Sequence, residues 1–250
     1  ISVPGGYEYT SPEAGMADYR LYAGKPVVIK PKSTNFGLGI TILKHNYDET
    51  DFKAALQIAF EHDNTVLIEK FIPGREFRIF IINDEVVGIL HRVPANVTGD
   101  GVLNIGQLID RKNEDPLRGK GYRTPLEKIR KGREEEMFLK QQGMDFNTVP
   151  KEGEVVYLRE NSNISTGGDS IDFTDDIDDS YKAIAVEAAK ALNVKITGLD
   201  MMIQDIHAPA TPDNYAIIEM NFNPAIHIHC YPFKGKNRHL NHKMIRALGF

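Results

Sequence analysis

The sequence predicts an α+β fold built on mostly antiparallel sheets with helices packed on their outer faces. Three observations indicate this class. Short β-branched runs outnumber the helical segments, several of these runs are separated only by turn residues, and helical segments alternate with them along the chain. The 250 residues are 41% hydrophobic and 26% charged, which is an ordinary globular composition.

The first half of the chain contains most of the predicted strands. Apolar residues recur at helical spacing over 51–62, and this spacing predicts a helix between two of the strands. Asn83 and Asp84 stand between two apolar runs, so we expect a hairpin there. The predicted strands of this half are 27–29, 40–43, 66–68, 77–82 and 86–90.

Residues 94–154 have a different texture, in which glycine and charged residues dominate. Only two short amphipathic pieces interrupt it, near 105–110 and 126–130. We interpret the central part, 99–152, as a large and partly ordered insertion, because long insertions in compact domains are often active-site covers. A flexible surface excursion is the alternative interpretation.

Strand and helix signals resume after this stretch. Residues 178–192 place apolar side chains on one face and acids at the start, which predicts a helix. A second helix over 241–248 is followed by Gly249, a typical helix stop. The predicted strands of this half are 155–158, 198–203 and 215–220.

Charge and cysteine content exclude several classes of protein. The 30 Lys and Arg residues face 35 Asp and Glu residues, a net charge of −5, so no basic excess is present for a nucleic-acid backbone. No apolar run approaches the roughly 18–20 residues that a membrane span needs. The single cysteine, Cys230, cannot form an intrachain disulfide, which suits a reducing compartment. We therefore expect a cytoplasmic protein that acts on small molecules.

The polar stretch 32–39 follows a strand and contains glycines. A glycine-rich turn leaves backbone N–H groups free to face phosphate oxygens, and a strand-end lysine can place its ammonium group on the same phosphates. A structural hairpin with an exposed edge lysine explains the same pattern. The candidate phosphate-binding residues are Lys30, Lys32, Ser33, Gly37 and Gly39.

A second candidate segment runs from Glu69 into the turn at Gly74. Backbone groups at 70–72 lose ladder partners where the strand ends, and such groups can read the edge of an adenine. Glu76, beyond the turn, could accept hydrogen bonds from ribose hydroxyls, and Arg78 shares its strand face. A salt-bridged hairpin edge is the alternative. The candidate nucleoside-binding residues are Glu69, Lys70, Phe71, Ile72 and Glu76.

Three oxygen-bearing side chains lie at the ends of two predicted strands. Glu219 and Asn221 are two residues apart and therefore share one strand face, and Asp200 begins the neighbouring apolar run. Carboxylates beside apolar strands are costly unless they are paired or bound to metal. Two carboxylates and an amide oxygen suit Mg²⁺ shared with phosphates, whereas a structural ion pair is the competing interpretation.

The run from Arg159 to Gly168 takes a strand into a turn that is dense with side-chain donors. Such a turn is a good cradle for a carboxylate or a terminal phosphate, and Arg92, at the end of another strand, offers a further cation. Arginines in mid-chain are also commonly plain surface charges. The candidate anion-binding residues are Arg92, Arg159, Asn161, Asn163, Ser165, Thr166 and Gly167.

Taken in order, these segments resemble the ATP-grasp ligases over nearly the whole chain. Residues 28–40 resemble especially closely the glutathione-synthetase module at the C-terminus of bifunctional glutamate–cysteine ligase/glutathione synthetases. Cyanophycin synthetase is the nearest sibling and shares the types of segment seen at 92–101, 108–111 and 163–172. The resemblance implies an ATP-grasp fold with the nucleotide between two subdomains.

The resemblance also implies roles for residues at matching positions. Lys30 would hold ATP phosphates under the loop 32–39, residues 69–72 would frame adenine, and Glu76 would bind ribose. Arg92, Arg159 and the turn 163–168 would hold the acyl phosphate and the substrate carboxylates, with Arg78 as a further candidate. The implied ligands of Mg²⁺, or of Mn²⁺, are Asp200, Glu219 and Asn221.

The family pattern implies a domain division as well. Residues 1–25 would be a lead-in, 26–72 the small subdomain with the glycine-rich loop, and 73–250 the second subdomain with its insertion. Family members have a further subdomain upstream of this region, so we expect this chain to lack it. The resemblance also suggests an upstream glutamate–cysteine ligase domain and a homodimer.

The implied reaction is the joining of a carboxylate to an amine through an acyl phosphate. ATP would phosphorylate the cysteinyl carboxylate of γ-glutamylcysteine, and glycine would attack to give glutathione. One alternative is an amino-acid or polypeptide ligase of the cyanophycin-synthetase type. A different class, a nucleotide-binding module without catalysis, is disfavoured because a pure binder could do without the combination of Asp200, Glu219 and Asn221.

Overall fold

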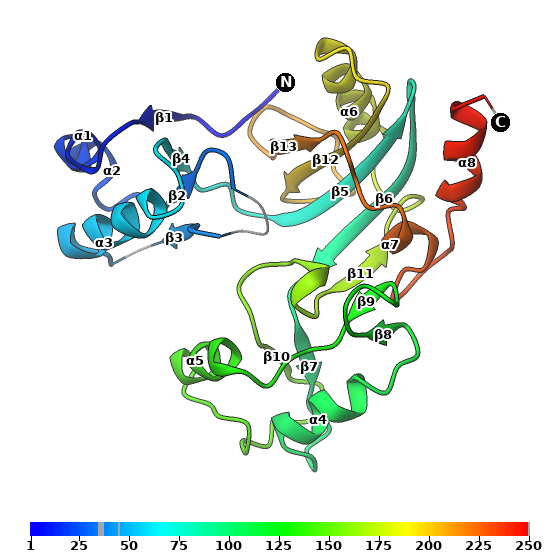
Figure 1. The fold of residues 1–250 in the computed structure, drawn as a ribbon, viewed down its shortest axis with the longest axis horizontal. Helices are drawn as coiled ribbons and strands as arrows, with labels where there is room; N and C mark the ends of the chain where they lie inside the picture. Colours follow the sequence, from blue (N-terminus) through cyan, green and yellow to red (C-terminus); the bar gives the residue numbers. More distant parts are fainter. Residues whose placement is uncertain (35–37, 45, 250) are drawn as a thin grey trace.

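The computed structural model describes residues 1–34, 38–44 and 46–249 and contains two antiparallel sheets and a third, smaller layer (Figure 1). The first sheet has four strands in the order β1-β4-β2-β3. Three helices, α1 (Pro12–Ala17), α2 (Tyr19–Tyr22) and α3 (Glu49–Phe60), belong to this part. Its strands are β1 (Gly6–Tyr9), β2 (Val27–Pro31), β3 (Thr41–Leu43) and β4 (Val66–Lys70).

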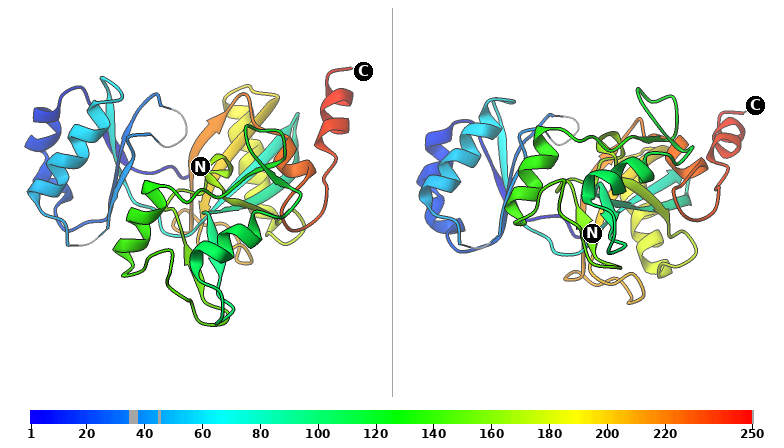
Figure 2. Two further views of the ribbon diagram at one scale, coloured as in Figure 1. Left: turned by 60° about the horizontal axis from the view of Figure 1, so that its bottom comes forward. Right: turned by 90° about the horizontal axis from the view of Figure 1, so that it is seen from below.

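Alternation along β2 and β4 assigns each face of this small sheet. Val27 and Ile29 are buried beneath α3, whereas Lys30 and Glu69 point to the opposite face, which is turned toward the rest of the molecule (Figure 2). The helices pack on the outer side (Figure 2). The small sheet therefore presents charged side chains, not its apolar core, to the second sheet.

The second sheet has five strands in the order β11-β6-β5-β12-β13. Helix α6 (Asp179–Ala191) covers the face that carries Phe77, Ile79 and Leu199. The other face carries Arg78 and then Phe80, which packs with α7 (His227–Cys230) and α8 (Leu240–Ala247). The strands are β5 (Arg75–Ile82), β6 (Glu85–Val93), β11 (Asp169–Asp172), β12 (Ile196–Ile203) and β13 (Tyr215–Asn221).

The third layer, formed by the segment from Ala95 to Leu158, is better organised than its composition suggests. It packs around an apolar cluster of its own that includes Ile105, Leu139 and Val156. The expectation of a partly ordered insertion underestimated this core, because its apolar residues are scattered among charged ones in the sequence. Its elements are β7 (Asn96–Thr98), α4 (Ile105–Lys112), β8 (Arg118–Gly119), β9 (Leu126–Glu127), α5 (Arg133–Gln141) and β10 (Val155–Tyr157).

The expected lead-in, residues 1–25, contributes structure to the small sheet. Strand β1 pairs with β4 in antiparallel register, and Tyr9 and Tyr22 are buried in the core of this part. Their hydroxyl oxygens lie 2.8 Å apart, and the Tyr9 hydroxyl also donates to Asp18 at 2.9 Å. The small apolar core therefore begins well before residue 26.

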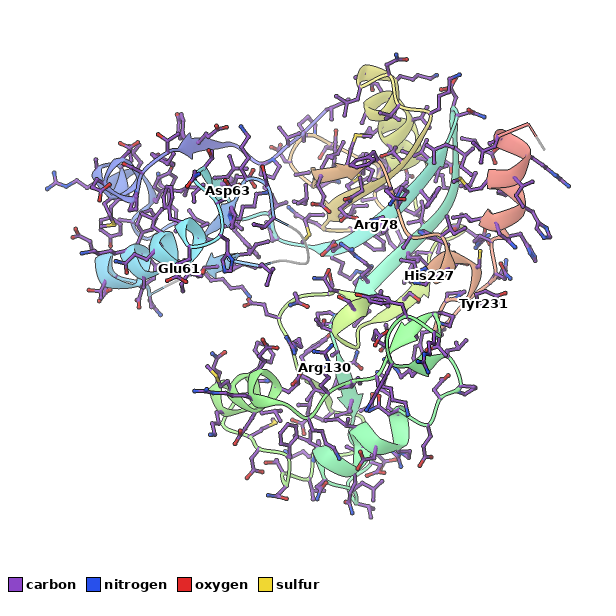
Figure 3. The ribbon with its side chains drawn as sticks, in the orientation of Figure 1. Glu61, Asp63, Arg78, Arg130, His227 and Tyr231 are labelled. Atoms are coloured by element: carbon purple, nitrogen blue, oxygen red, sulfur yellow. The ribbon has the colours of Figure 1, made fainter. Side chains whose placement is uncertain are left out.

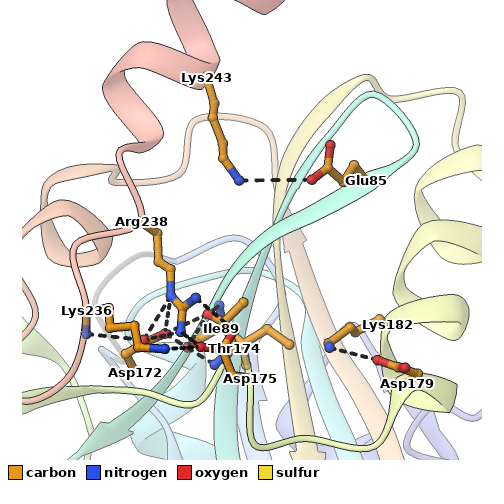
Figure 4. Close-up of polar contacts among 10 residues, drawn as sticks. All are labelled: Glu85, Ile89, Asp172, Thr174, Asp175, Asp179, Lys182, Lys236, Arg238 and Lys243. Carbon is orange, nitrogen blue, oxygen red and sulfur yellow. Dashed lines mark hydrogen bonds and ion pairs between the residues drawn. The ribbon is translucent and has the colours of Figure 1, made fainter.

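Ion pairs fasten the C-terminal segment to the large sheet (Figure 4). The guanidinium of Arg238 pairs with Asp172 and Asp175, and Lys236 also reaches Asp175, at 2.7 Å. Gly235, with φ of +117°, passes so close that a Cβ atom there would lie 2.4 Å from Asp172 Cβ. These ion pairs hold α7 and α8 against the large sheet.

Within the described part of the chain, no helix has the length and apolar character that crossing a bilayer requires.

Candidate active site

Two strands of the large sheet, β5 and β12, bring Arg78, labelled in Figure 3, directly opposite Asp200. The Arg78 guanidinium donates to both carboxylate oxygens, with a distance of 2.7 Å between Nη2 and Oδ2. Arg92, on β6, donates to the same Oδ2 at 2.9 Å. Burial opposes ionisation of Asp200, but the charges of Arg92 and Arg78 outweigh it and hold its pKa below the usual range.

Glu76, the second residue of β5, joins this group. Its carboxylate pairs with Arg92 and accepts a hydrogen bond from the Ser162 hydroxyl at 2.6 Å. The expected ribose ligand is therefore placed within an ion-pair network. Ser162, which sequence reasoning did not single out, links that network to the turn that follows β10; a serine among several polar turn residues gives no local signal of this contact.

The three expected metal ligands lie together at the edge of the sheet. Asp200 is the register partner of Glu219, and the Asn221 amide donates to Glu219 Oε1 at 2.9 Å. Arg78 Nη2 is 3.8 Å from the same oxygen. Desolvation and the neighbouring Asp200 carboxylate raise the pKa of Glu219 above its ordinary value.

We call Glu76, Arg78, Arg92, Asp200 and Glu219 the Asp200 network. Its two cations and three acids leave one negative charge. The side chain of Glu219 is 54% exposed, so this carboxylate and the Asn221 oxygen are open to an added cation, whereas the Asp200 oxygens are held by arginines. The donor set fits a divalent cation. Asp200 would bind such a cation with a carboxylate oxygen that now accepts a hydrogen bond from an arginine. Among the described residues, no three His, Cys, Asp or Glu side chains already form a metal site.

The opposing face of the small sheet carries the expected phosphate-binding residues. Lys30 Nζ lies 2.6 Å from Glu69 Oε2, and both side chains are mostly buried. Lys32 pairs with Glu8 at the surface at 2.7 Å, and the Ser33 N–H donates to Asp63, labelled in Figure 3. The turn at Gly39 has φ of +76°. Gly37 lies outside the described residues.

The strand end expected to frame adenine differs from prediction in one respect. The N–H groups of Lys70 and Phe71 are not free, because they donate to the carbonyls of Gly5 and Pro26 at 2.8 and 3.1 Å. These partners come from the lead-in and from the residue before β2, which a local strand-end argument does not include. Ile72 follows them in the link between β4 and β5.

The expected anion cradle forms a compact turn at residues 161–168. The Thr166 hydroxyl lies 2.9 Å from both the Asn161 side-chain oxygen and the Asn163 carbonyl. Ser165 is half-buried in the short 3₁₀ helix of this turn, which ends at Gly167 in the left-handed conformation, with φ of +94°. The turn thus has one defined conformation, fixed partly by its own side chains.

Arg159 is placed elsewhere than beside Asp200. Its guanidinium pairs with Glu134 and Glu135 at the start of α5, and Glu135 is buried. The segment of α5 is too polar for its sequence to predict a packed helix, so this pairing was not foreseen. Arg92, in contrast, joins the Asp200 network directly.

A second charged group lies behind the 161–168 turn and was missed by sequence reasoning. We call Asn96, Lys112, Arg118 and Asp169 the Asp169 network. Asp169 accepts from Asn96 at 3.0 Å and from Lys112 at 2.7 Å, and it also pairs with Arg118, whose side chain is fully buried. These residues are far apart in the sequence, and no spacing in it marks them as neighbours.

The chain was compared with known proteins. Over residues 10–104 it matches the family D-ala D-ala ligase C-terminus. It is 62% identical over 250 residues to the glutathione biosynthesis bifunctional protein GshAB of Desulfotalea psychrophila, covering 100% of this chain and 32% of that protein. The Clostridium perfringens protein of the same name is 56% identical, with 99% and 32% covered. The chain thus spans about a third of the length of these relatives.

Solved structures agree with the sequence comparison. The crystal structure of a bifunctional glutathione synthetase from Pasteurella multocida matches with a TM-score of 0.73 at 47% identity, covering 99% of this chain and 34% of that one. The ATP-grasp ligase PsnB matches at 14% identity with a TM-score of 0.51, covering 99% and 54%. The latter likeness concerns the fold alone. The predicted α+β, ATP-grasp class is confirmed.

Proposed function

This chain belongs to the ATP-grasp family, and from that premise we propose that it is a carboxylate–amine ligase that joins γ-glutamylcysteine to glycine. The observation that carries the proposal is the convergence of Asp200, Glu219 and Asn221 beside two arginines. The identity of 62% with a glutathione biosynthesis protein supports the choice of substrates.

The proposed metal ligands are Asp200, Glu219 and Asn221, which would hold Mg²⁺ or Mn²⁺. The negative charge of the Asp200 network favours such a cation. The metal would neutralise phosphate charge and polarise the phosphoryl group. A cation that shared the Asp200 carboxylate would weaken the attraction between Arg92 and Asp200, and Arg92 could then contact an anion.

Lys30 is the proposed contact to the ATP phosphates, together with Lys32, Ser33, Gly37 and Gly39. Its present partner, Glu69, lies beside the strand end that would frame adenine. The Lys30–Glu69 pair sits at one end of the short link between β4 and β5, and Glu76 sits at the other. This placement supports a nucleotide bound across the link.

Arg92 and the 161–168 turn are the proposed contacts to the acid substrate. Phosphoryl transfer would join the terminal phosphorus of ATP to a cysteinyl carboxylate oxygen and release ADP. The glycine amine would then form the amide bond while phosphate leaves with the electron pair of the broken C–O bond. Fixed cations such as Arg92 and Arg78 stabilise the charge that develops on the transferring groups. Arg159, held by α5, would act by fixing the turn from behind.

Water has to be excluded while the acyl phosphate exists, because acyl phosphates hydrolyse. The third layer supports this role, since residues 95–158 form an ordered body beside the 161–168 turn and not a loose loop.

The proposal also includes an upstream glutamate–cysteine ligase region, a homodimer and a cytoplasmic location. The relatives, about three times as long as this chain, support the first of these.

The test is an ADP-release assay on the full-length protein that contains this chain. We expect turnover that requires γ-glutamylcysteine, glycine and Mg²⁺ together, and glutathione as the product by mass spectrometry. Release that depends on aspartate or arginine would favour the cyanophycin-synthetase type instead. Nucleotide binding without turnover, unaffected by Asp200→Asn, would favour a non-catalytic module. Either result contradicts the proposal.

A further inference from the structure

We infer that Arg118, on β8 of the third layer, is a positioning residue for the acid-substrate site, acting through the 161–168 turn. The inference rests on the proposed function. Arg118 lies outside every segment that we assign to ATP, metal or substrate. It belongs to the Asp169 network and contacts the turn at Gly167, whereas the Asp200 network contacts the turn at Ser162.

The contacts of Arg118 join three segments. Its Nη1 donates to the Glu127 carbonyl at 2.8 Å and to the Gly167 carbonyl at 3.0 Å, and its Nη2 pairs with Asp169. The guanidinium carbon also lies 5.5 Å from the centre of the Phe233 ring. One side chain thus fixes the last residues of the turn, and the start of the strand that follows, against the third layer.

The 161–168 turn is tightly packed on both sides. A Cβ atom on Gly167 would lie 2.8 Å from Ile129 Cα, so the turn rests directly on the backbone of the third layer. A Cβ atom on Gly168 would lie 2.8 Å from the Val93 carbonyl oxygen. The turn is therefore packed between that layer and β6, and Arg118 donates a hydrogen bond to the Gly167 carbonyl at this point of contact.

The other end of the turn reaches the Asp200 network. Ser162 donates to Glu76, and Glu76 pairs with Arg92. A shift of the turn would therefore move Ser162 away from Glu76 and change where Arg92 points. A displacement of about 1 Å far from the reacting atoms can reduce turnover by about 100-fold.

A lysine cannot replace Arg118 in this role. Two carbonyls and a carboxylate are met by one planar group, and the ammonium group of lysine lacks that fork. Lys112 already supplies an ammonium group to Asp169. Arg118→Lys would keep the charge of the Asp169 network but loosen the Gly167 carbonyl, which separates positioning from charge balance.

The test compares Arg118→Lys with Arg118→Met and with the control Arg111→Met, whose arginine pairs with Asp100 at the surface of the same layer. We expect Arg118→Lys to lower kcat/KM for γ-glutamylcysteine by about 10- to 100-fold. The KM for ATP should stay within about twofold. Arg111→Met should change neither. An equal rise in the KM for ATP and the KM for γ-glutamylcysteine, or an unchanged kcat/KM in a folded Arg118→Lys protein, would overturn the inference.

Hydrogen exchange gives a readout that does not depend on the proposed reaction. Amides of 161–168 should exchange at least about 10-fold faster in Arg118→Lys than in the parent protein or in Arg111→Met, while amides of β5 and β12 stay protected. Unchanged exchange in the turn would refute the inference even if the parent protein lacks glycine-dependent turnover. Absence of that turnover together with faster exchange would refute only the proposed function. If Arg118→Met does not fold, the lysine variant decides.

Discussion

Two aspartates in this protein each lie between two cations, yet their surroundings are opposite. Asp200 meets Arg78 and Arg92 beside two further acids, Glu76 and the half-exposed Glu219. Asp169 meets Lys112 and Arg118, and among the described residues no further acid pairs with these two cations; they donate to backbone carbonyls instead. The first network is left with a negative charge, and the second with a positive one.

The difference teaches what each network is suited to do. Burial lowers the pKa of both Lys112 and Arg118, but the carboxylate and the carbonyls solvate their charges, and ring contacts with Phe233 add to this. The Asp169 carboxylate is already occupied by Asn96, Lys112 and Arg118. The Asp200 network has an open carboxylate on Glu219, with the Asn221 amide oxygen beside it, and a net charge that an added cation would neutralise. One network is suited to holding structure and the other to binding ligands.

The largest expected loss of stability follows from breaking the Asp169 network. Asp169→Asn leaves Lys112 and Arg118 buried without their carboxylate, and we expect it to lower the free energy of unfolding by about 3–5 kcal/mol. Urea denaturation measures this. The control is Asp110→Asn, which removes an exposed pair with Lys131 and should cost at most about 1 kcal/mol. Equal losses in the two variants would contradict the contrast drawn between the networks.

Removing the other aspartate should act on activity more than on stability. Asp200→Asn leaves two cations and two acids, a balanced set, so its stability loss should be smaller than that of Asp169→Asn. We expect kcat to fall by about 100- to 1,000-fold, because the metal and both arginines lose their shared partner. ADP release and thermal stabilisation by Mg²⁺ with an ATP analogue measure the effect. Asp213→Asn, in the loop before β13, should behave like the parent protein.

A fall in pH should lower the free energy of unfolding through His229, which is fully buried near the Asp200 network. Burial, aided by the charge of Arg78, lowers the pKa of His229 to about 3. A depressed histidine pKa contributes stability that is complete above about 6.5 and is lost as pH falls toward 3. His229→Leu should therefore flatten the loss of unfolding free energy below pH 6.5, by up to about 1.4 kcal/mol per pH unit. The exposed His207, changed to Asn, should leave the slope as it is.

The smallest expected effect concerns Glu219, whose raised pKa means that its ionised form opposes folding at neutral pH. The stability it contributes is present below its unfolded pKa and is lost as pH rises through the folded one. Without metal, Glu219→Gln should stabilise the protein by less than about 1 kcal/mol, because the side chain is half-exposed. The same change should weaken Mg²⁺ binding, measured by calorimetry. A less stable metal-free variant, compared with Glu187→Gln on α6, would contradict the assigned charge balance.

Much of the fold could be predicted because hydrophobic periodicity reports burial residue by residue. The hairpin about Asn83 and Asp84, and the strands that carry Asp200 and Glu219, lie where their apolar runs indicated. Elements with polar sequences, such as α5 and β11, were missed. Helix α5 is held by the buried Glu135, which pairs with Arg159, and this contact cannot be seen from the helix sequence alone.

The sequence predicted which candidate residues share a strand face, but it did not predict their contacts. The two-residue spacing of Glu219 and Asn221 requires a shared strand face, and Asp200 was placed beside them correctly. That Glu76 would meet Arg92, or that Lys70 and Phe71 would donate to Gly5 and Pro26, had no counterpart in local spacing. These partners come from strands that are neighbours only after folding.

The sequence by itself determined which side chains point to the same face of a strand, because the alternation of side chains is a local property of an extended backbone. It also determined the fold family, through the order of its motifs. Only the tertiary structure decided which cation neutralises which carboxylate. Asp200 and Asp169 differ because folding brings two further acids beside the first and places backbone carbonyls around the cations of the second.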